Sequence, residues 1–231
     1  MLAIEGLNQF YGQSQTLWDI ALEVPEGALV CLMGRNGVGK TTLLKAIMGL
    51  IPIRAGAIRF AGEDLSHRPA ERRAPLGIGY VPQGRQIFPL LTVEENLRIG
   101  LPIRQDRLKR VPEFIYELFP VLKTMLGRRG GDLSGGQQQQ LAIGRALVLQ
   151  PKLLILDEPT EGIQPNIVHE IGEVIRRLNR DQGLTVLLVE QKLGFARQTA
   201  DRFCILDKGR AVATDAMANL NDGLVRQYLT V

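Results

Sequence analysis

A glycine-rich stretch near the N-terminus leads into a lysine and two threonines. Glycines let backbone N–H groups turn toward an anion, and the start of a following helix adds positive potential at the same place. The stretch matches the P-loop pattern, in which the lysine contacts the β- and γ-phosphates of a nucleotide and the first threonine is a Mg²⁺ ligand. The predicted nucleotide-binding residues are Gly34, Arg35, Asn36, Gly37, Gly39, Lys40, Thr41 and Thr42, and Thr41 is also a predicted metal ligand.

Two carboxylates end an apolar run further along the chain. Asp157 and Glu158 follow directly after residues 153–156, which read Leu-Leu-Ile-Leu. A carboxylate at the end of a buried strand lies at the mouth of the sheet, beside the P-loop. Asp157 is predicted to hold Mg²⁺, and Glu158 to orient or polarise an attacking water. Without the P-loop, the same pair would more often be a helix cap or a turn.

Four residues in the middle of the chain form a second possible phosphate cradle, namely Ser134, Gly135, Gly136 and Gln137. Serine is a good N-cap, and the glycines would leave backbone N–H groups open to an anion. One nucleotide does not need two such cradles from one chain. Two chains facing head to tail would each offer one cradle to a shared nucleotide, whereas a plain helix cap is the simpler alternative.

These candidates need a sheet and helices to position them. Apolar runs predict strands at residues 2–7, 17–24, 29–33, 77–81, 153–156, 184–189, 203–206 and 211–214. Helical patterns run from near Lys40 to Gly49, from Ser134 to about Leu149, over 166–180 and over 193–199. A capping-box pattern at Thr92 opens a helical region that extends to about Arg129. Strands that alternate with helices predict the α/β class with a parallel sheet.

Composition narrows the class of protein. The chain has 231 residues, of which 45% are hydrophobic and 23% charged, as in a folded globular protein. No apolar run approaches the roughly 18 residues of a membrane-spanning helix, and no signal peptide is visible at the N-terminus. We therefore expect a cytosolic protein that reaches a membrane only by docking on a partner. Cys31 and Cys204 lie in apolar runs and are expected to be buried thiols, and His67 and His169 to be surface residues.

The chain carries a net charge of +4, with basic clusters at 104–110, 128–129 and 176–180. Aromatic residues make up only 5% and are not interleaved with these clusters, whereas recognition of nucleic acid needs base-reading or stacking groups beside the basic ones. We expect the clusters to be solvated helix faces and no nucleic acid to be bound.

Together the three motifs resemble those of the ABC (ATP-binding cassette) ATPases, and the resemblance covers essentially the whole chain. It implies one domain over 1–231, a P-loop NTPase fold. A RecA-like parallel sheet core with an antiparallel β subdomain would occupy 1–83 and 151–231. An α-helical subdomain over about 84–150 would carry the signature motif, Ser134 to Gln137, and would dock on membrane subunits.

The same resemblance assigns further roles. It implies ATP and Mg²⁺ as ligands, with two cassettes that sandwich two ATP molecules and part after hydrolysis. Tyr11 lies where the family has its adenine-stacking aromatic residue, and Gln83 resembles the glutamine that touches Mg²⁺ and senses the membrane subunit.

Two positions depart from the general family pattern. Gln191 stands where a histidine usually contacts the γ-phosphate and is assigned a catalytic role, although an amide cannot carry a proton or a positive charge. Gln164 stands where most members have an aspartate. Both changes are expected in the sub-branch of importers for branched-chain amino acids and for urea or amides.

The strings Gly84–Pro89 and Asp157–Pro165 look most like the second ATP-binding subunit of urea importers. The branched-chain amino-acid subunit usually has a glutamate at the position of Gln83. The resemblance thus implies an ATP-hydrolysing subunit that energises import of a small polar solute, first urea or short amides, with branched-chain or other amino acids as the alternative. It implies a second, related cassette as heterodimer partner, two permeases, a solute-binding protein, and a peripheral location on the cytoplasmic face of the membrane.

Other functions stay open at this stage. A non-transport ABC ATPase acting on DNA or ribosomes usually carries coiled-coil arms or two fused cassettes, which this chain lacks. A P-loop GTPase or kinase would leave Ser134 to Gln137 unexplained, and the guanine-reading Asn-Lys-x-Asp string is absent. A regulatory subunit with little hydrolysis is compatible with Gln164 and Gln191. An exporter is a further alternative within the family.

Overall fold

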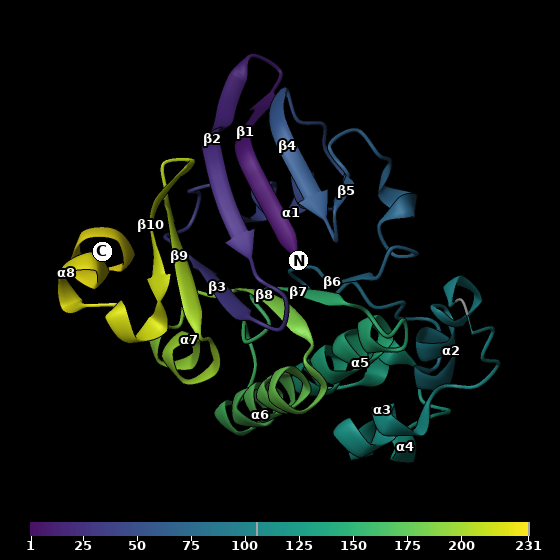
Figure 1. The fold of residues 1–231 in the computed structure, drawn as a ribbon. Coiled ribbons are helices and arrows are strands. Elements are labelled where there is room, and N and C mark those ends of the chain that lie inside the picture. The colour runs from purple at the N-terminus through teal and green to yellow at the C-terminus, as the bar shows by residue number, and fades with distance from the viewer. Residues whose placement is uncertain (105, 231) are drawn as a thin grey trace.

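The computed structural model describes residues 1–104 and 106–230, and two sheets organise it (Figure 1). The larger sheet has the strand order β10-β9-β3-β8-β7-β6. Neighbouring strands from β9 to β6 run parallel, and β10 pairs antiparallel with β9. The bounds are β3 Leu29–Met33, β6 Ile78–Val81, β7 Leu153–Asp157, β8 Thr185–Val189, β9 Arg202–Asp207 and β10 Arg210–Ala216.

The smaller sheet is antiparallel, in the order β2-β1-β4-β5. Its strands are β1 Leu2–Tyr11, β2 Ser14–Val24, β4 Ala55–Phe60 and β5 Glu63–Asp64. The first two are longer than predicted. Sequence reasoning missed β4, because only Ile58 and Phe60 of this strand are fully buried and Gly56 weakens the strand pattern.

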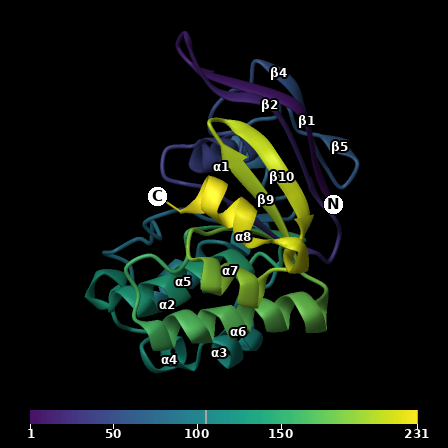
Figure 2. The same ribbon diagram turned by 90° about the vertical axis from the view of Figure 1, so that its left-hand side faces the viewer.

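The helices are α1 Lys40–Ile47, α2 Val93–Arg98, α3 Glu113–Leu118, α4 Pro120–Thr124, α5 Gly135–Leu147, α6 Pro165–Gln182, α7 Leu193–Thr199 and α8 Asp222–Leu224. In Figure 1, α1 lies behind the smaller sheet, whereas α5 and α6 run below the larger sheet, and Figure 2 shows α7 on the same side as α6. The short helices α2, α3 and α4 lie beside α5. The short 3-10 turns and a π-helical turn at Val225–Leu229 complete the described elements.

Alternate residues of the central strand β3 face two separate cores. Val30 and Leu32 belong to a core shared with α1 and the smaller sheet. Residues 29, 31 and 33 belong to a core shared with α5, α6 and α7. This burial on both faces explains the unbroken apolar run of a central parallel strand. Cys31 and Cys204 are buried thiols as predicted, and they lie in different cores.

The capping box predicted at Thr92 is present. The Thr92 hydroxyl accepts from the Glu95 amide at 3.2 Å, and the Glu95 carboxylate accepts from the Thr92 amide at 2.8 Å. The helix that follows ends at Arg98, and a 3-10 turn at Leu101–Ile103 replaces the continued helix. Pro102 lies inside that turn and has no N–H to extend a helix.

The predicted helix face at residues 104–110 is absent from the residues that the structure describes there, although residues 106–110 are exposed as predicted. Residues 104 and 106–110 have no helical conformation, and the Arg104 side chain is only 4% exposed. Its guanidinium donates to Asp106, to the Val148 carbonyl and to Gln150, and it lowers the pKa of Asp106 to about 2. Buried arginines need such partners, and charge counting along a sequence cannot show where they are.

In the parts of the chain that the structure describes, we find no helix with both the length and the apolar character needed to cross a membrane.

Candidate active site

Four neighbouring parallel strands deliver the predicted site residues to one edge of the larger sheet. The P-loop follows β3, Gln191 lies two residues after β8, Asp157 ends β7, and Gln83 lies two residues after β6. Asp157 is in register with Val189 at the end of β8, and Leu156 with Val81 at the end of β6. The carboxyl ends of parallel strands form the ligand-binding edge of such sheets.

Two P-loop glycines are required by their surroundings. A Cβ on Gly34 would lie 2.3 Å from the Leu206 carbonyl oxygen, and one on Gly39 would lie 2.8 Å from a Leu17 methyl group. Both glycines have positive φ angles, 148° and 108°, which side chains disfavour. Gly39 is the N-cap of α1 and gives it no side-chain cap. The N-terminal amides of α1 are therefore not occupied by a capping side chain.

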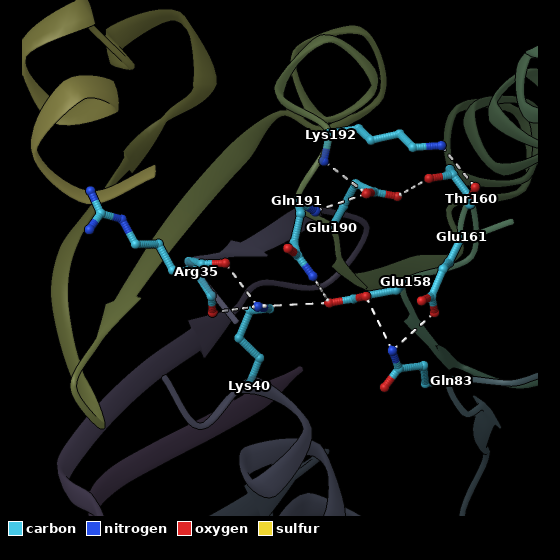
Figure 3. Close-up of polar contacts among 10 residues, drawn as sticks. Arg35, Lys40, Gln83, Glu158, Thr160, Glu161, Glu190, Gln191 and Lys192 are labelled. Carbon is cyan, nitrogen blue, oxygen red and sulfur yellow. Dashed lines mark hydrogen bonds and ion pairs between the residues drawn. The ribbon is translucent and has the colours of Figure 1, made fainter. Parts of the chain in front are cut away.

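The Lys40 side chain folds back over its own loop (Figure 3). Its Nζ donates to the carbonyl oxygens of Gly34 at 2.8 Å and Arg35 at 2.9 Å, and lies 3.8 Å from a Glu158 carboxylate oxygen. Burial lowers the pKa of Lys40, against the opposing effect of Glu158 and Asp157. The Arg35 side chain points the other way, toward the C-terminal segment, where it donates to the Thr230 carbonyl.

Three side chains converge on the Glu158 carboxylate, Lys40 through an ion pair and two glutamines through hydrogen bonds. Besides Lys40, the Gln83 amide nitrogen donates at 3.4 Å and the Gln191 amide nitrogen donates to the other oxygen. Glu158 has a φ of 48°, and its backbone N–H donates to the Val189 carbonyl at 2.9 Å. A non-glycine residue in this left-handed region is strained, and such strain is often found at functional sites. The turn brings this carboxylate back toward the P-loop.

Asp157 is buried without hydrogen-bond partners. Its side chain is 2% exposed, and neither carboxylate oxygen has a partner among the described residues. Burial, with the charge of Glu158, raises its pKa to about 6, against the effects of Thr41 and Lys40. An unpaired buried carboxylate is costly, and a cation would satisfy it.

The donor set fits Mg²⁺. No group of three His, Cys, Asp or Glu side chains among the described residues is arranged as a metal site. Mg²⁺ is commonly bound by one or two carboxylates together with substrate phosphates and water. Asp157, with Thr41 and Gln83 beside it, suits that mode of binding.

Sequence reasoning missed a second network behind Gln191. The Glu190 carboxylate is 2% exposed and accepts from the Thr160 hydroxyl at 2.7 Å. It also accepts from the amides of Gln191 and Lys192 at 2.8 and 2.9 Å, while Lys192 Nζ donates to the Thr160 carbonyl at 2.9 Å (Figure 3). Glu190 thus ties the turn after β8 to the loop after β7. In the sequence, the one feature that could have pointed to Glu190 is its position directly after an apolar strand.

A hollow of about 490 Å³ opens beside these groups. Its walls come from the P-loop and from the loops after β6, β7 and β8. The lining residues are Asn36, Gln83, Glu158, Thr160, Glu161, Gly162, Glu190, Gln191 and Lys192.

The remaining predicted residues lie apart from this cluster. Tyr11 ends β1 in the smaller sheet and is 48% exposed. Ser134 is the N-cap of α5, and within the described residues no hydrogen bond joins Ser134 to Lys40 or Glu158. Gln164 is the N-cap of α6 and makes no side-chain cap.

The start of α5 is more closed than the sequence predicts. The Ser134 hydroxyl accepts from the Gln137 amide at 3.4 Å, and the Gln137 side chain accepts from the Ser134 amide at 2.9 Å. This capping box satisfies two of the donors that an anion would use. Gly135 and Gly136 follow in the first turn of the helix.

Comparison with protein families decides the family. A model described as "ABC transporter" matches residues 17–161. The chain belongs to the ABC transporter family. The match extends from β2 through both glycine motifs to the loop after β7. The ABC ATPase fold and the ATPase activity coupled to transport, both predicted from the motifs, are thereby confirmed.

Individual relatives cover nearly the whole chain. The high-affinity branched-chain amino acid transport ATP-binding protein BraG of Pseudomonas aeruginosa is 44% identical, over 95% of this chain and 94% of BraG. The probable branched-chain amino acid transport ATP-binding protein LivF of Archaeoglobus fulgidus is 37% identical, over 95% and 93%. Among solved structures, the dimeric structure of MJ0796, a bacterial ABC transporter cassette, superposes with a TM-score of 0.83 at 25% identity, covering 94% of this chain and 99% of that one.

Proposed function

We propose that the chain is the motor subunit of an ABC importer and hydrolyses ATP at a site shared by two cassettes. The observation that carries this proposal is the convergence of Lys40, Gln83 and Gln191 on the Glu158 carboxylate. These are the groups that a γ-phosphate and its cation would engage. Without nucleotide, they contact the catalytic carboxylate instead, the two amides through hydrogen bonds and Lys40 through its charge.

Binding of the triphosphate frees that carboxylate. Lys40 exchanges its carbonyl partners, Gly34 and Arg35, for phosphate oxygens, which are stronger acceptors because they are charged. Gln191 then donates to the γ-phosphate, so two side chains leave Glu158. The carboxylate becomes available to orient a water and to accept its proton.

Mg²⁺ would be held by Thr41, Gln83 and Asp157, and it supplies charge neutralisation at the β- and γ-phosphates. The unpartnered oxygens of Asp157 support this assignment. Tyr11 is exposed enough to stack on an adenine ring.

A second cassette completes the site with its own signature segment, and Ser134 to Gln137 of this chain serve the partner's ATP. The dimer reported for MJ0796 supports this arrangement. We propose a related but different cassette as partner, two permeases, and a solute-binding protein. The permeases dock at the loop after β6, where Phe88 is 47% and Leu90 80% exposed. In this proposal the chain lies at the cytoplasmic face of the membrane.

Branched-chain or related amino acids are the favoured solute, because BraG and LivF are described as transporting them. Urea or short amides are a second candidate. The strings Gly84–Pro89 and Asp157–Pro165 and the glutamine at position 83 favour it. Uptake of labelled leucine and labelled urea by vesicles that contain the assembled transporter distinguishes the two. ATP-dependent uptake of neither would contradict both solute assignments.

The catalytic assignment is tested by Glu158→Gln in the assembled complex. We expect kcat to fall by about 10²–10⁴-fold, the usual contribution of a general base, while ATP affinity is retained. Glu71→Gln, at an exposed glutamate on a 3-10 turn, is the control. Undiminished turnover of Glu158→Gln, with contaminating ATPases excluded, contradicts the assignment.

A further inference from the structure

The loop after Gln83 has an unusual backbone. Gly84, Arg85 and Gln86 have consecutive positive φ angles of 76°, 68° and 46°. Two of the three carry side chains, which makes this conformation costly. Such a segment persists only where surrounding contacts hold it.

Arg145 of α5 holds the backbone of this loop. Its Nη2 donates to the Gln86 carbonyl at 2.7 Å and to the Arg85 carbonyl at 3.5 Å. Its guanidinium also lies 5.2 Å from the centre of the Phe88 ring. Helix α5, which begins at the signature motif, is therefore hydrogen-bonded directly to the loop after β6.

The Arg85 side chain then reaches to two other segments. Nη1 donates to the Gln138 side chain in α5, and Nη2 donates to the Glu161 carbonyl in the loop after β7, each at 3.3 Å. The guanidinium lies against Gly135, where a Cβ would be 3.1 Å from Nη1. The planar fork of arginine suits two acceptors at once, whereas lysine presents a single point charge.

Both acceptors lie next to residues of the proposed sites. Gln138 also donates to the Leu133 carbonyl at 3.2 Å, directly before Ser134. The Glu161 carboxylate accepts from Gln83 at 3.0 Å, and Gln83 also donates to Glu158. Arg85 is thus the side chain that links the start of α5 to the loop that carries the catalytic carboxylate.

We infer that Arg85 is a positioning residue: it sets the distance between the signature helix start, which serves the partner's ATP, and the catalytic loop of its own site. The inference rests on the proposed sharing of ATP by two cassettes. Arg85 makes no hydrogen bond to the described P-loop residues, so it acts on the closed pair of cassettes and not on binding of ATP to one chain.

The test compares Arg85→Gln and Arg85→Lys with the control Arg177→Gln. Arg177 is an exposed arginine of α6 that makes an ion pair with Asp181 at 3.9 Å. In the assembled complex, we expect Arg85→Gln to lower kcat about tenfold through misplacement of the two segments, with KM changed less than about twofold. Arg85→Lys should fall between the wild type and Arg85→Gln, and Arg177→Gln should match the wild type.

Binding of ATP to the isolated chain is the second readout. It should be the same for the wild type and all three variants, and their melting curves should confirm folding. If Arg85→Gln does not fold, Arg85→Lys carries the same comparison. Unchanged kcat in the folded variants, or a parallel loss of ATP affinity by the isolated chain, overturns the inference.

A different result would contradict the proposed function itself. Full ATPase activity of the wild-type chain in a sample shown to be monomeric contradicts the shared site whatever the Arg85 variants do.

Discussion

The two glycine-rich helix starts of this chain differ in what occupies their polar groups. The start of α1 has Gly39 as its N-cap and no capping side chain. The start of α5 has a reciprocal capping box between Ser134 and Gln137. From residue types alone the two look alike as phosphate cradles, but only the start of α5 has two of its backbone donors satisfied by a capping box.

The two helix starts also differ in the charged side chains beside them. Beside α1, Lys40 is buried and bound to backbone carbonyls, and Asp157 is buried with no hydrogen-bond partner in the part of the chain that the structure describes. No ionised side chain belongs to the capping box of α5. The P-loop side is therefore poised for a charged ligand, whereas the signature side is stable without one. This difference supports the proposal that ATP binds to the P-loop of one chain and that a second chain brings the signature segment to it.

We expect the largest effect from removing the positive charge of the P-loop. Lys40→Ala should weaken ATP binding by the isolated chain by about 100-fold, since hydrogen bonds from a charged donor contribute about 1.5–3 kcal/mol. Titration calorimetry or a fluorescent ATP analogue measures this. Lys45→Ala, at the C-terminal end of the same helix, is the control. Equal affinities of Lys40→Ala and the wild type would show that this helix start does not depend on its lysine.

The second prediction concerns how the buried Asp157 carboxylate changes the stability of the nucleotide-free chain with pH. Folding raises the pKa of Asp157 from 3.8 to about 6, so the folded chain binds the proton more tightly than the unfolded chain. This stabilisation is complete below about pH 4 and is lost as the pH rises through about 6. At about 1.4 kcal/mol per pKa unit, the ionised carboxylate costs up to about 3 kcal/mol above pH 6.

Asp157→Asn lacks this titration. Without nucleotide and with a chelator present, it should be more stable than the wild type at pH 7.5, and the difference should vanish near pH 4. Chemical denaturation at several pH values measures it, with Asp181→Asn, at an exposed position of α6, as the control. A difference that does not vary with pH would contradict the buried, unpaired state of Asp157.

The smallest expected effect is a loss of stability rather than a gain, and it comes from the signature segment. Ser134→Ala should destabilise the isolated chain by about 1 kcal/mol, the usual contribution of an N-cap, and leave its ATP affinity unchanged. In the assembled complex, the same variant should lower kcat. Denaturation and ATPase assays measure the two effects. A loss of ATP affinity in the isolated chain would mean that Ser134 contacts the nucleotide bound to its own P-loop, and the two helix starts would then not differ in this way.

Local sequence was sufficient for much of the molecule. Runs such as residues 29–33 must be buried strands because they contain only apolar side chains, and Gly34 to Lys40 then needs no distant partner to be recognised. The Thr92 capping box was likewise predictable, because both of its members lie within one turn. Strand β4 was missed because its pairing with β1, rather than its own pattern, makes it a strand.

The parts of the site that were not predictable depend on contacts between distant segments. Arg104 was taken for a solvated charge, but its partners Val148 and Gln150 lie more than forty positions away in the chain. In the sequence, Glu190 cannot be told from any other polar residue at the end of a strand. Only the fold brings Thr160 within hydrogen-bond distance of it. The side chains that contact Glu158 come from the start of α1 and from the loops after β6 and β8, and only the order of the strands in the larger sheet brings them together.

Residue types and spacing therefore established that the chain has a P-loop, a carboxylate pair after a strand and a serine-led glycine helix start, because each of these is a local pattern. Tertiary structure decided that Asp157 is unpaired, that three side chains converge on Glu158, and that Arg85 spans two segments. Burial and hydrogen bonding across the fold set these states, and neither is encoded in any single stretch of the chain.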